Sequence, residues 1–140
     1  MRGSSRRPDA GMHAVDTNVI VRYLTGDDRE QADKARALIG HESVFVPRTV
    51  LLEVEWVLRG VYELSSEQII PALRALAGLP GVSVEDAAMV ARAMDWSEAG
   101  LDFADALHLA AAAECESFLT FDKRLARSGT RLSGLAVASP

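Results

Sequence analysis

Short apolar runs alternate with longer amphipathic stretches along the chain. Runs rich in valine, phenylalanine and alanine are typical of short buried strands. They occupy residues 12–15, 43–46, 82–84, 117–121 and 135–139. Between these runs, apolar residues recur at the three- and four-residue spacing of an amphipathic helix. The helical stretches occupy residues 17–24, 28–40, 49–60, 65–81, 85–96, 100–109 and 123–129.

Residue types at the ends of several stretches support these boundaries. Gly40 and Gly60 each stand at the end of a helical stretch, where glycine is the commonest terminator. Pro47 closes the second strand, because proline cannot donate a hydrogen bond to a sheet. A serine cap opens the stretch at 65–81, and Pro71 lies near its first turns, where proline is tolerated best.

Strands that alternate with helices predict an α/β fold, a three-layer α/β/α sandwich with a mostly parallel sheet. The 140 residues are 49% hydrophobic, which suits one domain with its own core, and we assign it to residues 12–138. Residues 1–11 are rich in arginine, serine and glycine and lack apolar periodicity. We interpret them as a disordered tail or a remnant of the cloning vector.

Charge and cysteine content limit the classes of function. The formal net charge of -5 argues against binding nucleic acid through overall electrostatics, although it leaves room for a local basic rim. The single cysteine, Cys115, cannot form an internal disulfide, and we expect a small buried residue in a reducing compartment. Asp16, Asn18 and Arg22 interrupt the first apolar segment, so neither a secretory signal nor a membrane span is predicted, and we expect a cytoplasmic protein.

Acidic residues follow two of the predicted strands. Asp16 comes directly after the first strand and Asp122 after the fourth, and ligands of open α/β sheets bind beyond the carboxyl ends of strands. Asp105 interrupts the otherwise apolar helix at 100–109. Each has a structural alternative, because Asp16 and Asp122 suit helix caps and Asp102 with Asp105 resembles a capping pair.

Glu53 is harder to explain by capping. Its neighbour Glu55 has Arg59 four residues later, in the favourable order for a pair on a helix surface. Glu53 has no basic residue at helical neighbour positions, and only His108 could offset the charge of Asp105. Carboxylates in such places need solvent, a distant cation or a metal.

The chemistry of these acids favours a hard divalent cation. Two carboxylates about 4 Å apart repel by on the order of 4 kcal/mol at an effective dielectric constant near 20. All-oxygen ligands suit Mg²⁺ or Mn²⁺, whereas Cys115 and the histidines show no paired spacing for zinc. A carboxylate-held metal can activate water and offset charge on a phosphodiester, which suggests metal-assisted phosphoester hydrolysis.

Four motifs together resemble the PIN-domain ribonucleases, and specifically the VapC-type toxins of bacterial toxin–antitoxin pairs. They are AVDTNVIVRYL, LLEVEWVLRG, DFADALHLAAA and LTFDKRLAR, and the likeness extends over nearly all of Met12 to Val137. The resemblance implies a PIN-like fold and endonucleolytic cleavage of RNA with Mg²⁺ or Mn²⁺. By motif, the implied metal ligands and catalytic carboxylates are Asp16, Glu53, Asp105 and Asp122.

The resemblance also implies supporting residues and partners. Thr17, Asn18 and Thr120 stand at polar positions that shape the pocket by hydrogen bonding, and Asp102 is an implied supporting residue. A VapB-type antitoxin and a homodimer are the implied protein partners, and RNA is the implied substrate. From charge alone we add candidate phosphate contacts, because arginine and lysine position nucleic-acid backbones. They are Arg22, Lys123, Arg124 and Arg127.

Other classes fit the sequence less well. A phosphoacceptor receiver domain needs a lysine after its last strands, and the chain has only Lys34 and Lys123. A haloacid-dehalogenase phosphatase needs a second aspartate where Asn18 stands. The alternative from a different class is a non-catalytic regulatory module with the same fold, in which the acidic pocket binds a cation or a basic peptide.

Overall fold

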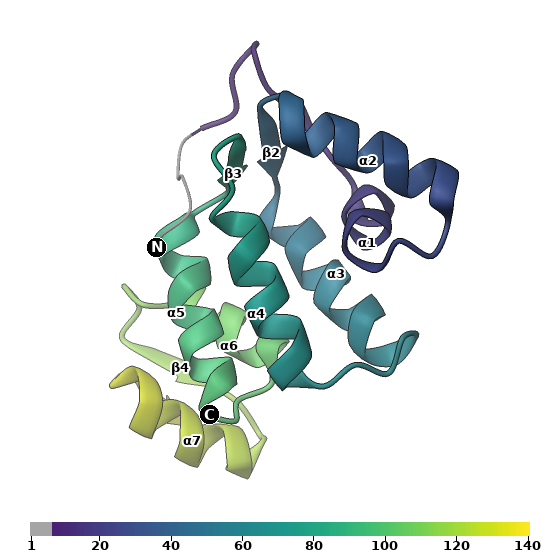
Figure 1. Cartoon of the computed structure of the whole chain (residues 1–140). Coiled ribbons are helices and arrows are strands. Elements are labelled where there is room, and N and C mark those ends of the chain that lie inside the picture. The colour runs from purple at the N-terminus through teal and green to yellow at the C-terminus, as the bar shows by residue number, and fades with distance from the viewer. Residues whose placement is uncertain (1–6) are drawn as a thin grey trace. The chain divides into compact units, whose positions relative to one another are not determined.

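A computed structural model describes residues 7–140 and divides the chain into two compact units. The first unit ends at Ala88, and the second is Met89–Pro140 (Figure 1). Residues 1–6 of the predicted tail lie outside the described residues. The remainder of that segment is exposed, and Asp9 Oδ1 accepts a hydrogen bond of 2.9 Å from the Gly11 backbone N–H.

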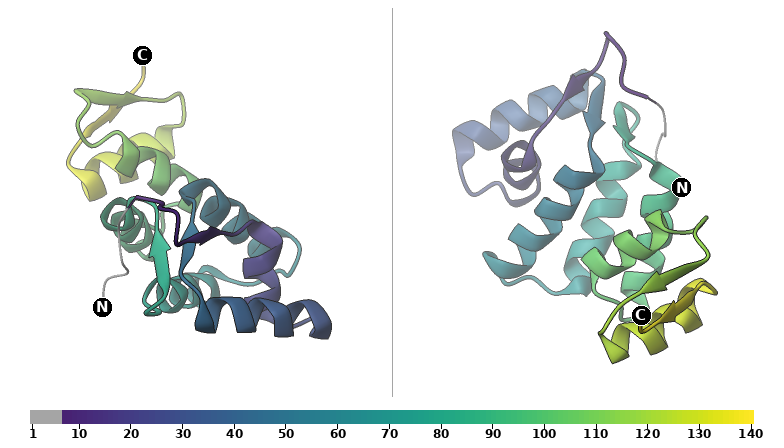
Figure 2. Two further views of the ribbon diagram at one scale, coloured as in Figure 1. Left: turned by 90° about the horizontal axis from the view of Figure 1, so that it is seen from above. Right: turned by 180° about the vertical axis from the view of Figure 1, so that it is seen from behind.

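The first unit contains a three-stranded parallel sheet of order β1-β2-β3. The strands are His13–Ala14 (β1), Val44–Val46 (β2) and Val82–Val84 (β3), and the helices are Thr17–Thr25 (α1), Arg29–His41 (α2), Arg48–Gly60 (α3) and Ser66–Ala77 (α4). Parallel neighbours require crossover connections. Helices α1 and α2 connect β1 to β2, and α3 and α4 connect β2 to β3 (Figures 1 and 2).

The core of this unit surrounds strands β2 and β3. Val44 pairs with His13 on one side and with Val82 on the other, and Val46 pairs with Val84. Every residue of β2 and β3 is buried, as expected for a parallel sheet whose faces are both covered. Both residues of β1 are exposed, which is consistent with an edge strand.

Helix α3 begins without a cap from its own N-terminal residue. Pro47 precedes it and has no side chain that could accept a hydrogen bond. Glu85, which follows β3, accepts a hydrogen bond of 3.0 Å from the Arg48 backbone N–H. The Arg48 guanidinium also forms an ion pair with Asp86. Because the free N–H groups at a helix start need partners, these acids fix the start of α3 against the end of β3.

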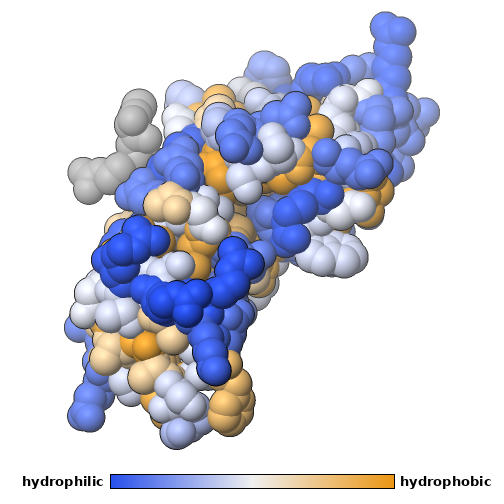
Figure 3. Space-filling model, turned by 90° about the horizontal axis from the view of Figure 1, so that it is seen from below, coloured by the Kyte–Doolittle hydropathy of each residue, from blue (hydrophilic) through white to orange (hydrophobic). Residues whose placement is uncertain are grey.

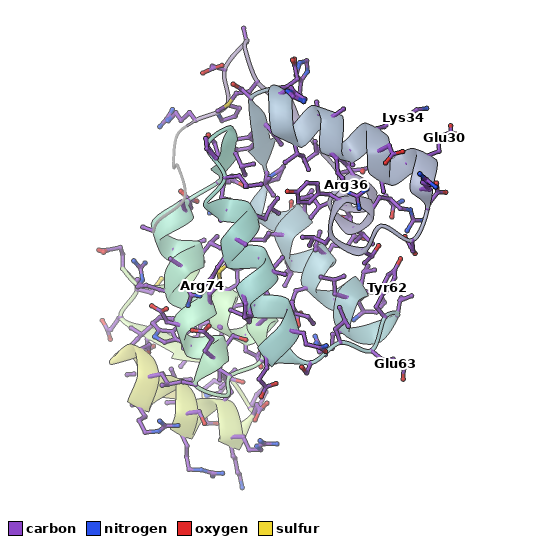
Figure 4. All side chains as sticks on the ribbon, viewed as in Figure 1. Glu30, Lys34, Arg36, Tyr62, Glu63 and Arg74 are labelled. Carbon is purple, nitrogen blue, oxygen red and sulfur yellow. The ribbon has the colours of Figure 1, made fainter. Side chains whose placement is uncertain are left out.

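A polar cluster joins the loop between α1 and α2 to the segment after α3. The hydroxyl of Tyr62, which is labelled in Figure 4, donates a hydrogen bond to Asp27. The Asp27 carboxylate also pairs with Arg22 at 3.1 Å. The hydrogen bond from Tyr62 lowers the pKa of Asp27, burial opposes it, and Thr25 and Arg22 lower it further. A carboxyl whose pKa is lowered in the folded protein stabilises the fold at every pH above its unfolded-state pKa. This stabilisation is lost as the pH falls through the folded-state pKa.

We predict that Tyr62→Phe makes the protein less stable at neutral pH, because the largest cause of the lowered Asp27 pKa is removed. The difference from wild type should shrink as the pH falls below about 4, where carboxyls become protonated in the unfolded chain. Thermal unfolding from pH 7 to pH 3 measures this. Tyr23→Phe is the matched control, because no side-chain hydrogen bond of Tyr23 is found among residues 7–140. A pH-independent effect of Tyr62→Phe would contradict the prediction.

The second unit contains a pair of parallel strands. Its elements are Ala87–Glu98 (α5, which begins at the boundary), Phe103–Ala111 (α6), Ser117–Leu119 (β4), Lys123–Ser133 (α7) and Ala136–Ala138 (β5). Helix α7 connects the two strands, and Ser117 pairs with Ala136 (Figure 2). A Cβ on Gly129 would lie 3.2 Å from both Leu109 and Val137, so α7 packs closely against α6 and β5.

Two sequence-based expectations about single residues are wrong. Cys115 is exposed rather than buried, because α6 ends at Ala111 and the alanine-rich segment continues as a turn. Glu55 does pair with Arg59, at 2.8 Å, but it is 3% exposed and so lies in the core rather than on the helix surface. None of the helices in the described part of the chain has the length and apolar character that a membrane crossing requires.

Candidate active site

Asp16 lies between β1 and α1 and caps that helix. Its Oδ1 accepts a long hydrogen bond of 3.4 Å from the Val19 backbone N–H. The other carboxylate oxygen, Oδ2, has no hydrogen bond among residues 7–140, and the residue is exposed. The cap therefore orients the carboxylate and leaves one oxygen for a ligand.

Glu53 lies on α3 and is held by a residue of α1. The buried hydroxyl of Thr17 donates a short hydrogen bond to Glu53 Oε1. No lysine, arginine or histidine of residues 7–140 forms an ion pair with Glu53. Thr17 follows Asp16 directly in the chain, so the Thr17 hydrogen bond ties the neighbour of one acid to the other acid. Asn18, the next predicted pocket residue, is exposed on α1.

Asp105 lies on the first turn of α6 in a partly desolvated environment. Burial raises its pKa, and the negative charge of Asp102 raises it further. His108 has the opposite, lowering effect, and Asp122 adds a smaller raising effect. Asp102 is the cap of α6, accepting a hydrogen bond of 3.2 Å from the Asp105 backbone N–H. Asp105 therefore carries its charge at a cost that like-charged neighbours increase.

Asp122 lies at the start of α7 and is a well-formed cap. Its Oδ1 accepts hydrogen bonds from the backbone N–H groups of Arg124 at 2.9 Å and Leu125 at 3.1 Å. The Asp122 N–H donates to the Thr120 hydroxyl oxygen at 3.0 Å, so Thr120 fixes the turn that carries the acid. As in Asp16, Oδ2 has no hydrogen bond within the described part of the chain.

Two of the predicted acids lie in each unit. Asp16 and Glu53 are connected through Thr17 in the first unit, and Asp105 responds to the charge of Asp122 in the second. Among residues 7–140, no group of three histidine, cysteine, aspartate or glutamate side chains is close enough to hold a metal ion. A shared centre of four carboxylates therefore stays a prediction.

The donor atoms nevertheless suit a hard cation. Asp16 and Asp122 each have a carboxylate oxygen without a hydrogen bond, and Glu53 lacks a cationic partner in the described chain. All of these donors are oxygens, which Mg²⁺ and Mn²⁺ prefer over nitrogen or sulfur. Capping accounts for Asp16, Asp102 and Asp122, but it gives no role to Glu53 or Asp105.

The predicted phosphate contacts differ in their availability. Arg22 is engaged by Asp27, by the Tyr62 hydroxyl at 3.1 Å and by Gln31 at 2.9 Å. Lys123 and Arg124 are exposed at the start of α7, without an ion pair among the described residues. Arg131 was not among the predicted phosphate contacts, although its spacing of four residues from Arg127 places both on one helix face.

Comparison with known proteins decides the family. A family model described as PIN domain matches residues 14–129, which is most of the chain. The chain belongs to the PIN domain family. No curated protein and no solved structure gives a significant match. Membership, together with the parallel pairing of the strands found in residues 7–140, confirms the expected α/β class with its three-layer PIN-like fold.

PIN domains are generally nucleases, and they typically depend on divalent metal ions. The chain is therefore assigned to the hydrolases at this coarse level. In this PIN domain the acids that would serve such chemistry are two helix caps, immediately before α1 and α7, and two residues on α3 and α6.

We predict that Asp105→Asn slightly raises the melting temperature without metal, because one repelling charge is removed from a partly buried place. Mg²⁺ should raise the melting temperature of the wild type. At a free Mg²⁺ concentration 100 times the dissociation constant, the added stability is about 2.7 kcal/mol. The melting temperature of the variant should rise far less. Thermal unfolding in EDTA and in Mg²⁺ measures both effects. The control is Glu116→Gln, which removes an exposed, unpaired charge of the same described unit. Equal Mg²⁺ shifts in wild type and Asp105→Asn would contradict the assignment.

Proposed function

We propose that the protein is a Mg²⁺- or Mn²⁺-dependent endoribonuclease that acts as the toxin of a VapBC-type toxin–antitoxin pair. The observation that supports this most is that Glu53 and Asp105, at two motif positions of a PIN domain, have neither a capping role nor a lysine or arginine partner among the described residues. Binding of a metal ion would account for both carboxylates.

In this proposal the metal ligands are Asp16, Glu53, Asp105 and Asp122. When bound, the cation supplies an activated water and offsets the charge of the attacked phosphodiester. Thr17 holds the Glu53 carboxylate, and Thr120 holds the turn of Asp122. Such hydrogen bonds keep ligands oriented before the metal binds, which lowers the cost of assembling the site.

Lys123 and Arg124 would contact the phosphates of the RNA, because they follow Asp122 directly and are exposed. Arg22 could take this role only by giving up its contact with Asp27. Asp102 would help to position Asp105, because its side chain caps the start of α6 by accepting a hydrogen bond from the Asp105 backbone N–H. Asn18 would contribute an amide to the rim of the pocket.

The proposed partners are a VapB-type antitoxin and a second copy of the chain, and the proposed location is the cytoplasm. An apolar pocket on the first unit is lined by residues of α1 and α2, including Val19, Ala35 and Leu38. Trp56 and Val61 are large exposed apolar residues of the same unit. Exposed apolar surface of this kind supports protein partners.

We predict that Glu53→Gln lowers Mg²⁺-dependent cleavage of a labelled single-stranded RNA by at least on the order of 100-fold, because a metal ligand contributes several kcal/mol to the transition state. Its unfolding should remain close to that of wild type. Glu55→Gln should do the reverse: it weakens a buried ion pair, costing roughly 1.5–3 kcal/mol of stability, while the folded variant still cleaves.

Wild type in EDTA, and the Asp16→Asn variant purified in parallel, control for contaminating nucleases. Equal cleavage by wild type and Glu53→Gln would refute the nuclease assignment of this residue. If the wild type binds Mn²⁺ and does not cleave RNA, the protein is the non-catalytic regulatory module instead.

A further inference from the structure

Helix α7 carries four basic side chains on its exposed surface. They are Lys123, Arg124, Arg127 and Arg131. Within residues 7–140, none of these side chains has a hydrogen bond or an ion pair. By contrast, Lys34 and Arg36 on α2 are paired with acids one turn away (Figure 4). The cations of α7 therefore keep their charge available for a ligand, in a protein whose formal net charge is -5.

The four cations lie on one face of the helix. At about 100° per residue they fall within an arc of about 100°, and the centre of that arc is opposite the buried residues Leu125 and Gly129. Close packing at Gly129 holds the opposite face against β5, and hydrogen bonds between the Thr130 hydroxyl and the Val137 backbone, at 3.0 and 3.2 Å, attach the side of the helix to the same strand. The basic face is thereby fixed toward solvent.

The space-filling view is consistent with this arrangement. Seen from below, where α7 lies in Figure 1, the surface shows an arc of the most hydrophilic residues, with apolar residues next to it (Figure 3). Lys123, Arg127 and Arg131 follow one another at intervals of four residues, which is about 6 Å along the helix axis. A row of cations at regular intervals suits a polyanion with regularly spaced charges better than a single anion.

An exposed aromatic ring adjoins this basic face in the chain. Phe121 is 84% exposed and is separated from Lys123 only by the capping residue Asp122. Leu119, two residues earlier at the end of β4, is also exposed, at 58%. A phenylalanine so exposed gains little from the core. An exposed aromatic ring followed in the chain by exposed cations is a combination that suits single strands, because bases stack on the ring while cations contact phosphates.

We propose that Phe121 and the basic face of α7 bind single-stranded RNA. A base stacks on the Phe121 ring, and successive phosphates lie along Lys123, Arg127 and Arg131. A duplex fits less well, because its bases are already stacked on one another and cannot reach the ring. This proposal rests on the proposed ribonuclease function. It adds a surface that binds the RNA in single-stranded form and that lies outside the proposed metal ligands.

The test uses the full chain in EDTA, so that binding is separated from cleavage. A fluorescent oligouridine is titrated at several salt concentrations, and a double-stranded RNA of the same length serves for comparison. We expect Phe121→Ala to weaken binding on the order of 5- to 150-fold with an unchanged salt dependence, and Phe121→Trp to retain it. Arg127→Gln with Arg131→Gln should weaken binding and lower the slope of log affinity against log salt by about 0.7 per lost contact.

Controls separate the proposal from its alternatives. Arg29→Gln removes an exposed cation of α2, unpaired within the described residues, and should leave binding unchanged. Thermal unfolding and light scattering of each variant report folding and self-association. The proposal is overturned if the Phe121 and α7 variants bind oligouridine as the wild type does, if duplex binds as tightly as single strand, or if Phe121→Ala changes only the oligomeric state.

The same samples assayed with Mg²⁺ distinguish this inference from the nuclease proposal. Binding through α7 without cleavage by the wild type would support the surface and refute the nuclease. Cleavage by the wild type with no loss of binding or rate in the α7 variants would support the nuclease and refute the surface.

Discussion

Carboxylates without a compensating cation are the constraint on which the candidate site depends. Glu53 receives only a hydroxyl hydrogen bond from Thr17 within the described chain, and Asp105 lies partly buried beside the charges of Asp102 and Asp122. Partly desolvated charges of one sign cost free energy unless hydrogen bonds or counterions offset them. A divalent cation would remove this cost for Asp105, whereas Glu53 is exposed and is held in position by the hydrogen bond from Thr17.

Helix capping and metal binding do not exclude each other in this chain. Asp16 and Asp122 each use Oδ1 to accept backbone hydrogen bonds at a helix start, and the described residues provide no hydrogen bond to Oδ2. A cap restricts the rotation of the carboxylate without using all of its lone pairs. The strand-to-helix turns therefore supply oriented oxygens as a consequence of ordinary helix termination, and the same turn at Asp122 places Phe121 and Lys123 on either side of it.

Local pattern predicted most elements to within a few residues, because helical and strand periods reflect burial along each element. It also predicted the pair of Glu55 and Arg59, which depends only on spacing within one helix. It was wrong about Cys115, because an alanine-rich composition favours a helix but does not set where α6 ends. Contacts such as Thr17 with Glu53 depend on packing between distant segments, which periodicity does not encode.

The central claim of the proposed function is that these carboxylates are ligands of a hard divalent cation, and Mn²⁺ binding followed by electron paramagnetic resonance tests it most directly. Wild type, Asp16→Asn, Asp105→Asn and the control Glu116→Gln are titrated with Mn²⁺. Saturable binding is expected for the wild type and the control, and at least about tenfold weaker binding for both aspartate variants, since each loses a carboxylate that is proposed as a metal ligand. Unchanged Mn²⁺ affinity in either aspartate variant, or no saturable binding by the wild type, would contradict it.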